Sequence, residues 1–320
     1  MTASTIELRV QREVDWRRLQ SYLLVAWFTF QTTAVLVGPI LGGLPFGWDA
    51  VVYTSAARAL VDGGDPWRAM GYAIPYAAPP PSLIPFLPFV WLPDSLVSVA
   101  WIGIDLTSAV YAIRRLGMPL WWLLFPPLAL GIAAGSGAVF ALALLVRGGV
   151  VADSMAVLTR IYVGLPLAVL GRWRSVAVSI GTLALTAPFL AWPTFMAERE
   201  HVSTVIVANA GTSATAVPWM MPVAILCLVL LGRRRAGWLL IPALWPFTQP
   251  YYAVMALPVL AELPLVAVAL AIPIPGLVVA GMAGHAALER IGFRSPVLAT
   301  SATARAQAPV FASGSGDHSA

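Results

Sequence analysis

Apolar runs alternate with short polar intervals along almost the whole chain. The first run extends from Ser21 to Leu44, and later runs lie at about 82–93, 95–113, 119–134, 137–152, 157–171, 175–195, 215–232, 236–248, 251–271 and 275–288. A membrane-spanning helix needs about 20 mostly apolar residues, so the longer runs predict spans and the shorter ones predict tilted, kinked or re-entrant segments. The pattern predicts an all-α, polytopic integral membrane protein with about 9–11 transmembrane helices.

The polar intervals divide the chain into three parts. Residues 1–20 are expected to form a cytoplasmic N-terminal segment, and residues 21–290 a transmembrane domain with an outer loop at 47–81. The other long polar interval covers 196–214. Residues 291–320 are rich in Ala, Ser, Thr and Gly and show no helical period, which is typical of a disordered tail.

Clusters of arginine predict the orientation of the spans, because cationic flanks are retained in the cytoplasm. The arginines that precede the first run are Arg9, Arg12, Arg17 and Arg18. We therefore expect a cytoplasmic N-terminus and both long polar intervals outside. Counting 82–93 as a full span, however, places Arg114 and Arg115 outside. Discounting it places Arg172 and Arg174 outside, so the arginines alone leave this choice open.

The composition excludes several other classes of protein. Hydrophobic residues make up 59% of the chain and charged residues 10%, and the mean hydropathy is +0.83, which excludes a disordered chain, a coiled coil and a conventional soluble enzyme. The net charge of +5 does not indicate nucleic-acid binding, because the arginines form short clusters rather than a continuous basic face. The single cysteine, Cys227, excludes a disulfide framework. The motifs of ATP-driven pumps and membrane zinc proteases are also missing from the sequence.

Asp49 opens the outer loop and is the first candidate for chemistry. A short amphipathic helix is predicted over 50–61, with Tyr53 one turn after Asp49 on the same side. Asp is a favoured N-cap residue, so capping this helix is one interpretation of Asp49. The other is a general base held at the boundary between water and lipid. The two are compatible, because a capping carboxylate can keep one oxygen free.

Three ionisable residues interrupt apolar runs, where a charge is expensive to bury. Arg160 lies inside such a run and is predicted to be functional. Asp105 and Asp153 are accounted for by ion pairs with arginines.

Charged residues of the loops each allow two interpretations. Arg58, Arg68 and His201 are either solvated or contact a phosphate group. Asp49, Asp62 and Asp65 together are carboxylates that could bind a divalent cation. The sequence predicts no firm metal site.

The outer loop carries a resemblance to a known family. The run WDAVVYTSAARALVDGGDPW at 48–67, followed by a proline-rich approach to the membrane, resembles the first outer loop of the GT-C glycosyltransferases. It is most similar to the polyprenyl-phosphate-mannose-dependent mannosyltransferases of bacterial envelopes. The matching positions are Asp49, Tyr53, Ala56, Ala57, Gly63, Asp65, Pro66 and Trp67. Weaker similarity extends over residues 20–290 and includes Arg160-Ile161-Tyr162 and Pro250-Tyr251-Tyr252.

Two features of that family are altered here. The tyrosine of its Tyr-Pro-Pro motif is displaced to Tyr76, because Ala77 and Ala78 precede the prolines. The histidine that relatives carry near the start of a late span is absent beside Tyr251 and Tyr252. If that histidine holds the donor phosphate in relatives, another group must do so here, and our hypothesis is that this group is the guanidinium at position 160.

The resemblance implies a membrane glycosyltransferase. Such an enzyme moves a sugar, here expected to be mannose, from a polyprenyl-phosphate donor to an envelope glycolipid or glycan acceptor at the extracytoplasmic face of the cell membrane. Asp49 is then the catalytic base. The expected substrate-binding residues are Tyr53, Arg58, Asp65, Arg68, Arg160 and His201. No nucleotide or other cofactor is implied, since the activated sugar arrives on a lipid, and the resemblance favours counting 82–93 as a span.

A non-catalytic transporter of lipids or small solutes is the alternative. Transporters carry ionisable groups at mid-membrane, and Arg160, Asp105 and Asp153 fit that description. Against this alternative, the sequence shows no internal symmetry, and its polar residues are concentrated in one outer loop.

Overall fold

The computed structural model describes residues 3–208, 211–246 and 248–290, with the backbone alone before residue 18. Most of these residues are helical, which confirms the helical part of the expected fold class. The one sheet in this part of the chain is a hairpin in which β1 (Met70–Gly71) pairs antiparallel with β2 (Ile74–Pro75). The predicted tail at 291–320 lies outside the described residues.

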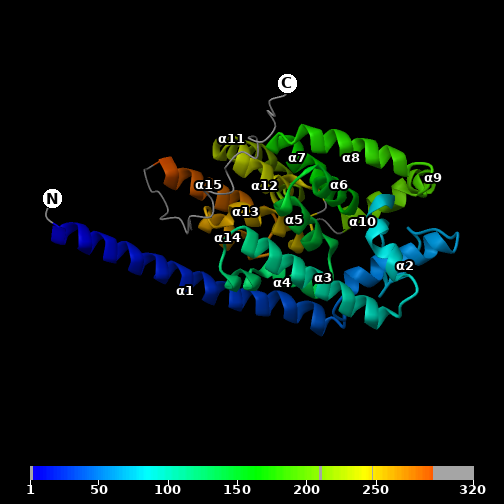
Figure 1. The fold of residues 1–320 in the computed structure, drawn as a ribbon, viewed down its shortest axis with the longest axis horizontal. Coiled ribbons are helices and arrows are strands. Elements are labelled where there is room, and N and C mark those ends of the chain that lie inside the picture. Colours follow the sequence, from blue (N-terminus) through cyan, green and yellow to red (C-terminus); the bar gives the residue numbers. More distant parts are fainter. Residues whose placement is uncertain (1–2, 209–210, 247, 291–320) are drawn as a thin grey trace, which may run out of the picture.

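The helices follow one another as drawn in Figure 1: α1 (Ala3–Leu41), α2 (Trp48–Val61), η1 (Pro80–Phe89), α3 (Asp94–Arg115), η2 (Leu120–Leu124), α4 (Pro126–Ala134), α5 (Gly137–Arg147), α6 (Val150–Thr159), η3 (Ile161–Val163), α7 (Gly164–Leu170), α8 (Trp173–Thr186), α9 (Trp192–Ala197), α10 (Arg199–Ala208), η4 (Ala214–Ala216), η5 (Pro218–Met220), α11 (Met221–Leu231), α12 (Arg233–Leu244), η6 (Pro250–Ala256), α13 (Leu257–Leu260), α14 (Pro264–Leu270) and α15 (Leu277–Arg290). The η elements are 3₁₀ helices.

Two of these helices are long and apolar enough to cross a membrane, namely the Arg18–Leu41 part of α1 and the whole of α3. α4 and α5 meet at a bend of 118°, and they give a third crossing if the two helices are counted as one broken span. The other apolar runs form helices of 14 residues or fewer. Full-length helices are therefore fewer in the described residues than the roughly 9–11 expected from run lengths, because prolines and glycines interrupt the runs.

The segment 82–93, which we expected to be a span, lies mostly within η1. η1 has 10 residues. At a rise of about 2 Å per residue it is roughly 20 Å long, shorter than the roughly 30 Å of a bilayer core. Pro85 and Pro88 lie inside it and lack the N–H that an α-helix would use. η1 packs against α2, so counting this segment as a full span is wrong.

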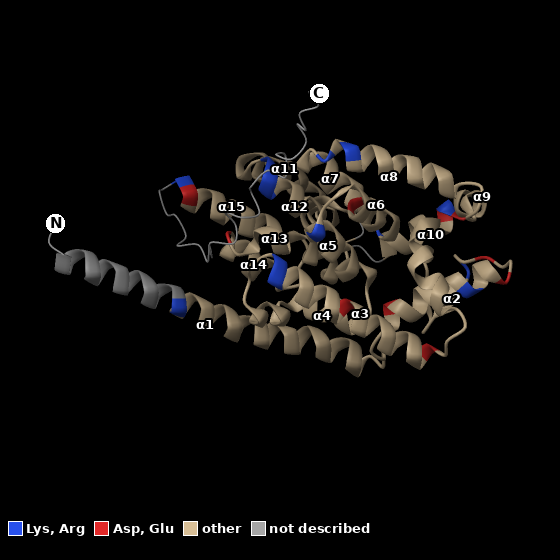
Figure 2. Cartoon of the chain, viewed as in Figure 1, with Lys and Arg blue, Asp and Glu red and all other residues tan. Residues whose placement is uncertain are grey.

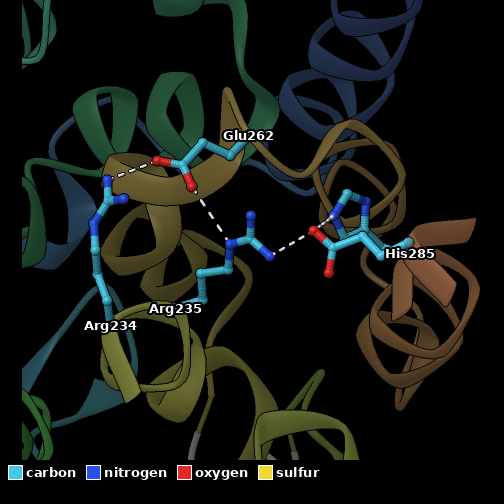
Figure 3. A network of polar contacts seen from close by, with 5 residues as sticks. Arg234, Arg235, Glu262 and His285 are labelled. Carbon is cyan, nitrogen blue, oxygen red and sulfur yellow. Dashed lines mark hydrogen bonds and ion pairs between the residues drawn. The ribbon is translucent and has the colours of Figure 1, made fainter. Parts of the chain in front are cut away.

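The arginine clusters at 172–174 and 233–235 come together in space. Arg233 donates from Nε to the carbonyl oxygen of Val169, just before the first cluster, at 2.6 Å. The second cluster continues into a network of ion pairs formed by Arg234, Arg235, Glu262, Glu289 and His285 (Figure 3). The two clusters therefore lie near each other in space.

The two long polar intervals, 47–81 and 196–214, meet at the other end of the molecule. Arg68 pairs with Glu198 at 2.7 Å, and the ring centres of Trp67 and Phe195 are 5.3 Å apart. In Figure 1 this end holds α2, α9 and α10, whereas α12 and α15 lie toward the opposite end.

Charged residues are sparse on the helices (Figure 2). Large apolar side chains are exposed on α1, α8 and α11, among them Tyr22, Leu23, Phe30, Ile180, Leu185, Leu226 and Val229. An apolar surface of this extent is suited to contact with lipid rather than water.

Two carboxylates inside apolar helices differ in their partners. Asp153 on α6 is 1% exposed and accepts hydrogen bonds from Arg172 at 2.9 Å and from Ser175 at 2.7 Å. The predicted pairing with an arginine is therefore confirmed for Asp153. Asp105 on α3 is fully buried and forms no ion pair with any described residue, so the predicted pairing is wrong there.

Replacing Asp153 should destabilise the fold, because Arg172 and Ser175 would lose their shared acceptor. We expect Asp153→Ala to lower the free energy of unfolding by about 3 kcal/mol, measured as a lower midpoint of thermal unfolding in detergent. Asp94→Ala is the matched control, since Asp94 pairs with Arg58 at 2.7 Å on the surface, where an ion pair contributes about 0–1 kcal/mol. Equal shifts for the two variants would contradict this ranking.

Candidate functional site

A cavity of about 680 Å³ lies where the two polar intervals meet. This volume is within the range of small-molecule sites. The wall is formed by the end of α1, by α2, by the segment around β2, by the break between α6 and η3, by α10 and by the start of η6. Most of it is apolar, and among the described residues the charged side chains on it are Asp49 and Arg160.

Asp49 reaches the cavity from the first turn of α2. The preceding Gly47 has a φ of 79°, which favours glycine, and a Cβ there would lie 2.4 Å from the Cβ of Ser98 on α3. Glycine thus lets the start of α2 approach α3 closely. The N-cap of α2 is Gly47, without a side-chain cap bond. The interpretation of Asp49 as the N-cap is therefore wrong, and its carboxylate contacts Arg160 instead.

The Asp49 carboxylate is nearly buried and has one charged partner. Its side chain is 13% exposed, and its Oδ2 accepts a hydrogen bond from Nη2 of Arg160 at 3.2 Å. Burial raises the pKa of Asp49 above its ordinary value, while the charge of Arg160 and the side-chain hydroxyls of Ser136 and Tyr251 oppose this rise. Asp49 is thus a carboxylate of increased proton affinity with three neighbours that orient it.

Arg160 enters the site where α6 ends. Its backbone is extended, with φ −144° and ψ 97°, between the end of α6 and the start of η3. The side chain is 3% exposed, and Nη2 also donates to Oγ of Ser136 at 3.3 Å. Nε and Nη1 are buried without a hydrogen-bond partner in the described parts of the chain. Buried guanidinium nitrogens are normally paired, so these two nitrogens retain unused capacity to donate hydrogen bonds in a side chain that lines the cavity.

Tyrosine rings surround the guanidinium of Arg160. Its Cζ lies 4.5 Å from the ring centre of Tyr53 and 5.9 Å from that of Tyr252, distances at which cation–π attraction stabilises an arginine removed from water. Tyr162 lies 4.8 Å from Tyr252, ring centre to ring centre. The hydroxyl of Tyr162 is buried and has no hydrogen-bond partner among the residues that the structure describes.

The bend between α4 and α5 supplies a polar side chain that sequence reasoning missed. Gly135 at the bend adopts the left-handed conformation with φ 67°, and Ser136 caps α5 by accepting from the N–H of Ala138 at 3.4 Å. A Cβ on Gly137 would lie 3.5 Å from Nη2 of Arg160, so the bend packs directly on the guanidinium. The available signal was the Gly-Ser-Gly interruption between two apolar runs.

Arg58 and Asp65, predicted to bind substrate, form hydrogen bonds with the chain around them. Arg58 donates to the carbonyl oxygens of Val90 at 2.9 Å and Leu92 at 2.5 Å. Asp65 accepts the backbone N–H of Trp67 at 2.9 Å. Neither residue lines the cavity. Their hydrogen-bond partners are backbone groups of nearby turns. The sequence shows that these side chains are charged, but it does not show whether they bind the backbone or a substrate.

Arg68 and His201 also lie outside the cavity wall. Arg68 is 60% exposed and pairs with Glu198, and His201 is on α10, from which Val202 faces the cavity. Among the described residues, no group of three His, Cys, Asp or Glu side chains could hold a metal ion. The predicted residues that the structure does bring together are Asp49, Tyr53 and Arg160.

Comparison of the chain with protein-family models, with curated proteins and with solved structures finds no match. The chemistry of the site is therefore argued from its geometry. A nearly buried carboxylate can accept a proton. The adjacent guanidinium can bind and stabilise an oxyanion such as a phosphate.

Removing the cation of this pair should destabilise the protein, because Asp49 would be left as a buried carboxylate without a counter-charge. We expect Arg160→Gln to lower the free energy of unfolding by about 3 kcal/mol. The double variant Asp49→Asn/Arg160→Gln should lose less than the sum of the two single variants. Thermal unfolding of the four proteins in detergent measures this coupling, and additive losses would show that the two side chains do not interact.

Proposed function

We propose that this chain is a multi-pass glycosyltransferase of the cell membrane with a GT-C-like fold. It moves a sugar, mannose by the resemblance, from a polyprenyl-phosphate donor to an envelope glycolipid or glycan acceptor on the extracytoplasmic face. The observation that carries the proposal is the ion pair of Asp49 and Arg160 on the wall of a largely apolar cavity. The carboxylate serves proton transfer, and the guanidinium serves a phosphate leaving group.

Asp49 acts as the base of this reaction. It takes the proton of the acceptor hydroxyl while the acceptor oxygen forms a bond to C1 of the sugar. The bond between C1 and the phosphate oxygen breaks, and its electron pair leaves with the polyprenyl phosphate. One carboxylate suffices for such an inverting displacement, because the acceptor attacks C1 directly.

Arg160 and Tyr162 bind the phosphate. The leaving phosphate gains negative charge as its bond to C1 breaks, and a preorganised guanidinium stabilises that charge. Two nitrogens of Arg160 and the hydroxyl of Tyr162 are buried without a hydrogen-bond partner among the described residues, and phosphate oxygens would be their acceptors. Arg160 would then hold the donor phosphate, in place of the histidine that the resembling family carries and this chain lacks.

The apolar part of the cavity suits an isoprenoid chain. Pro39 of α1 and Val202 and Ile206 of α10 contribute to this part of the wall. α1 also presents large apolar side chains to the outside, as a helix in contact with lipid does. A donor whose tail runs along these side chains would stay in the bilayer while its phosphate reaches the guanidinium.

The charge distribution supports an extracytoplasmic site. The arginines that precede the first apolar run lie in the first half of α1, whereas the end of α1 forms part of the cavity wall near α2 and α10 (Figure 1). Because arginine clusters are retained in the cytoplasm, the cavity would open toward the outer face, where lipid-linked sugar donors and envelope acceptors meet.

Asp49→Asn tests the base directly. Asparagine keeps the size of the side chain but cannot accept the proton, so we expect the transfer rate to fall by about a hundredfold or more while the protein still inserts and binds donor. Transfer of sugar from a polyprenyl-phosphate-mannose donor to envelope glycolipids is measured with purified protein in lipid vesicles.

The matched control is Asp62→Asn, which removes an exposed carboxylate at the other end of α2 and should leave the rate unchanged. Near-normal turnover by the Asp49 variant would overturn the catalytic role. The transporter of lipids or small solutes would then become the better hypothesis.

The pH dependence of transfer should report the same group. Because only ionised Asp49 can act as a base, and because burial raises the pKa of Asp49 above its ordinary value, the rate should fall as the pH is lowered through that raised pKa. A phosphodiester donor does not change its charge in this range. A rate that is constant down to the ordinary pKa of aspartate would contradict this prediction.

A further inference from the structure

The contact between Asp49 and Arg160 is a weak form of ion pair. It consists of one hydrogen bond from Nη2 at 3.2 Å, at the long end of the usual range, rather than the two parallel bonds that a guanidinium can form with a carboxylate. The same nitrogen also donates to Ser136. Arg160 is thus held to Asp49 by one nitrogen, while Nε and Nη1 have no hydrogen-bond partner in the described ranges.

A phosphodiester can form more hydrogen bonds with this guanidinium than Asp49 does. Its two non-bridging oxygens can accept parallel N–H bonds from the planar guanidinium and would satisfy nitrogens that are now unpaired. The ring of Tyr53 lies 4.5 Å from Cζ, well within the range of cation–π attraction, so the guanidinium would keep this attraction after a small shift. A shift toward a phosphate in the cavity lengthens the single bond to Asp49.

We propose that the donor phosphate displaces Asp49 from Arg160, so that Asp49 becomes a free base only after the donor has bound. This inference rests on the proposed function and makes the donor the first substrate and the acceptor the second. Before the donor binds, the two charges neutralise each other, and no lone carboxylate is buried. The hydroxyls of Ser136 and Tyr251 remain beside Asp49 when the guanidinium shifts and keep its carboxylate oriented.

Binding of a phosphodiester that carries no sugar tests the proposal. Geranyl methyl phosphate has one negative charge and a short isoprenoid chain, and its dissociation constant for the purified protein is measured by isothermal titration calorimetry. If Asp49 competes for Arg160, Asp49→Asn should tighten binding about tenfold, although it abolishes transfer. Arg160→Gln should abolish binding. Asp94→Asn is the control, since Asp94 also pairs with an arginine but on the surface and away from the cavity, and its binding should equal that of the wild type.

The outcomes separate this proposal from the proposed function. Unchanged or weaker binding by Asp49→Asn, with normal binding by the wild type, would overturn the displacement and leave the glycosyltransferase reaction in place. Absence of binding by the wild type would overturn both, because the phosphate site itself would be missing.

A second measurement uses protein in which Asp49 is intact. The probe keeps its charge as the pH falls, whereas protonation of Asp49 frees the guanidinium, so binding should tighten toward acidic pH. The charged and titratable groups that interact with Asp49 are Arg160, Asp105, Tyr162, Tyr251 and Tyr252. Arginine and tyrosine keep their protonation states in acid, and Asp105→Asn removes the remaining titratable group. Binding that is independent of pH in the wild type and in Asp105→Asn would overturn the proposal.

Discussion

The structure depends on the ion pair of Asp49 and Arg160, because burying a charge is costly unless a counter-charge lies beside it. Asp49 and Arg160 are 111 residues apart in the sequence, and each side chain can remain inside the protein because the other is there. The pair connects the start of α2 to the break after α6, and through Ser136 it also connects both to the bend between α4 and α5. The cavity forms around this junction, so the same interaction that joins distant elements brings a proton acceptor and an anion-binding group to one wall.

Short and broken helices bring the residues around the Asp49–Arg160 pair together. The bend of 118° between α4 and α5 and the extended residue after α6 place irregular backbone at the cavity. Irregular backbone is tolerated in a membrane protein where it is buried in protein or lines a cavity. Straight helices of full length would offer neither the serine at the bend nor the arginine at the break. The interruptions that reduce the number of full-length helices are therefore also what assembles the site.

Charged residues of the outer loop connect the elements that surround the cavity. Arg58 ties α2 to the chain between η1 and α3 through Val90, Leu92 and Asp94. Arg68 ties the same loop to the segment before α10. Surface ion pairs of this kind contribute little to stability individually, but the hydrogen bonds to backbone carbonyl groups stabilise turns that would otherwise be left without donors. These arginines thus position the elements around the site without touching its interior.

The sequence by itself determined the local features of this protein. Hydrophobic periodicity predicted helices throughout, including the short helix that is α2, with Asp49 and Tyr53 on one side of it, and the cost of burying a charge singled out Arg160. Only the tertiary structure decided which groups meet: Asp49 with Arg160 rather than with its own helix end, Asp153 with Arg172, and the predicted ligands Arg58, Asp65, Arg68 and His201 away from the cavity. It also decided that most of 82–93 folds within η1, which packs against α2. Periodicity and capping act over a few residues and can be read along the chain, whereas an ion pair between distant residues depends on how all the intervening helices pack.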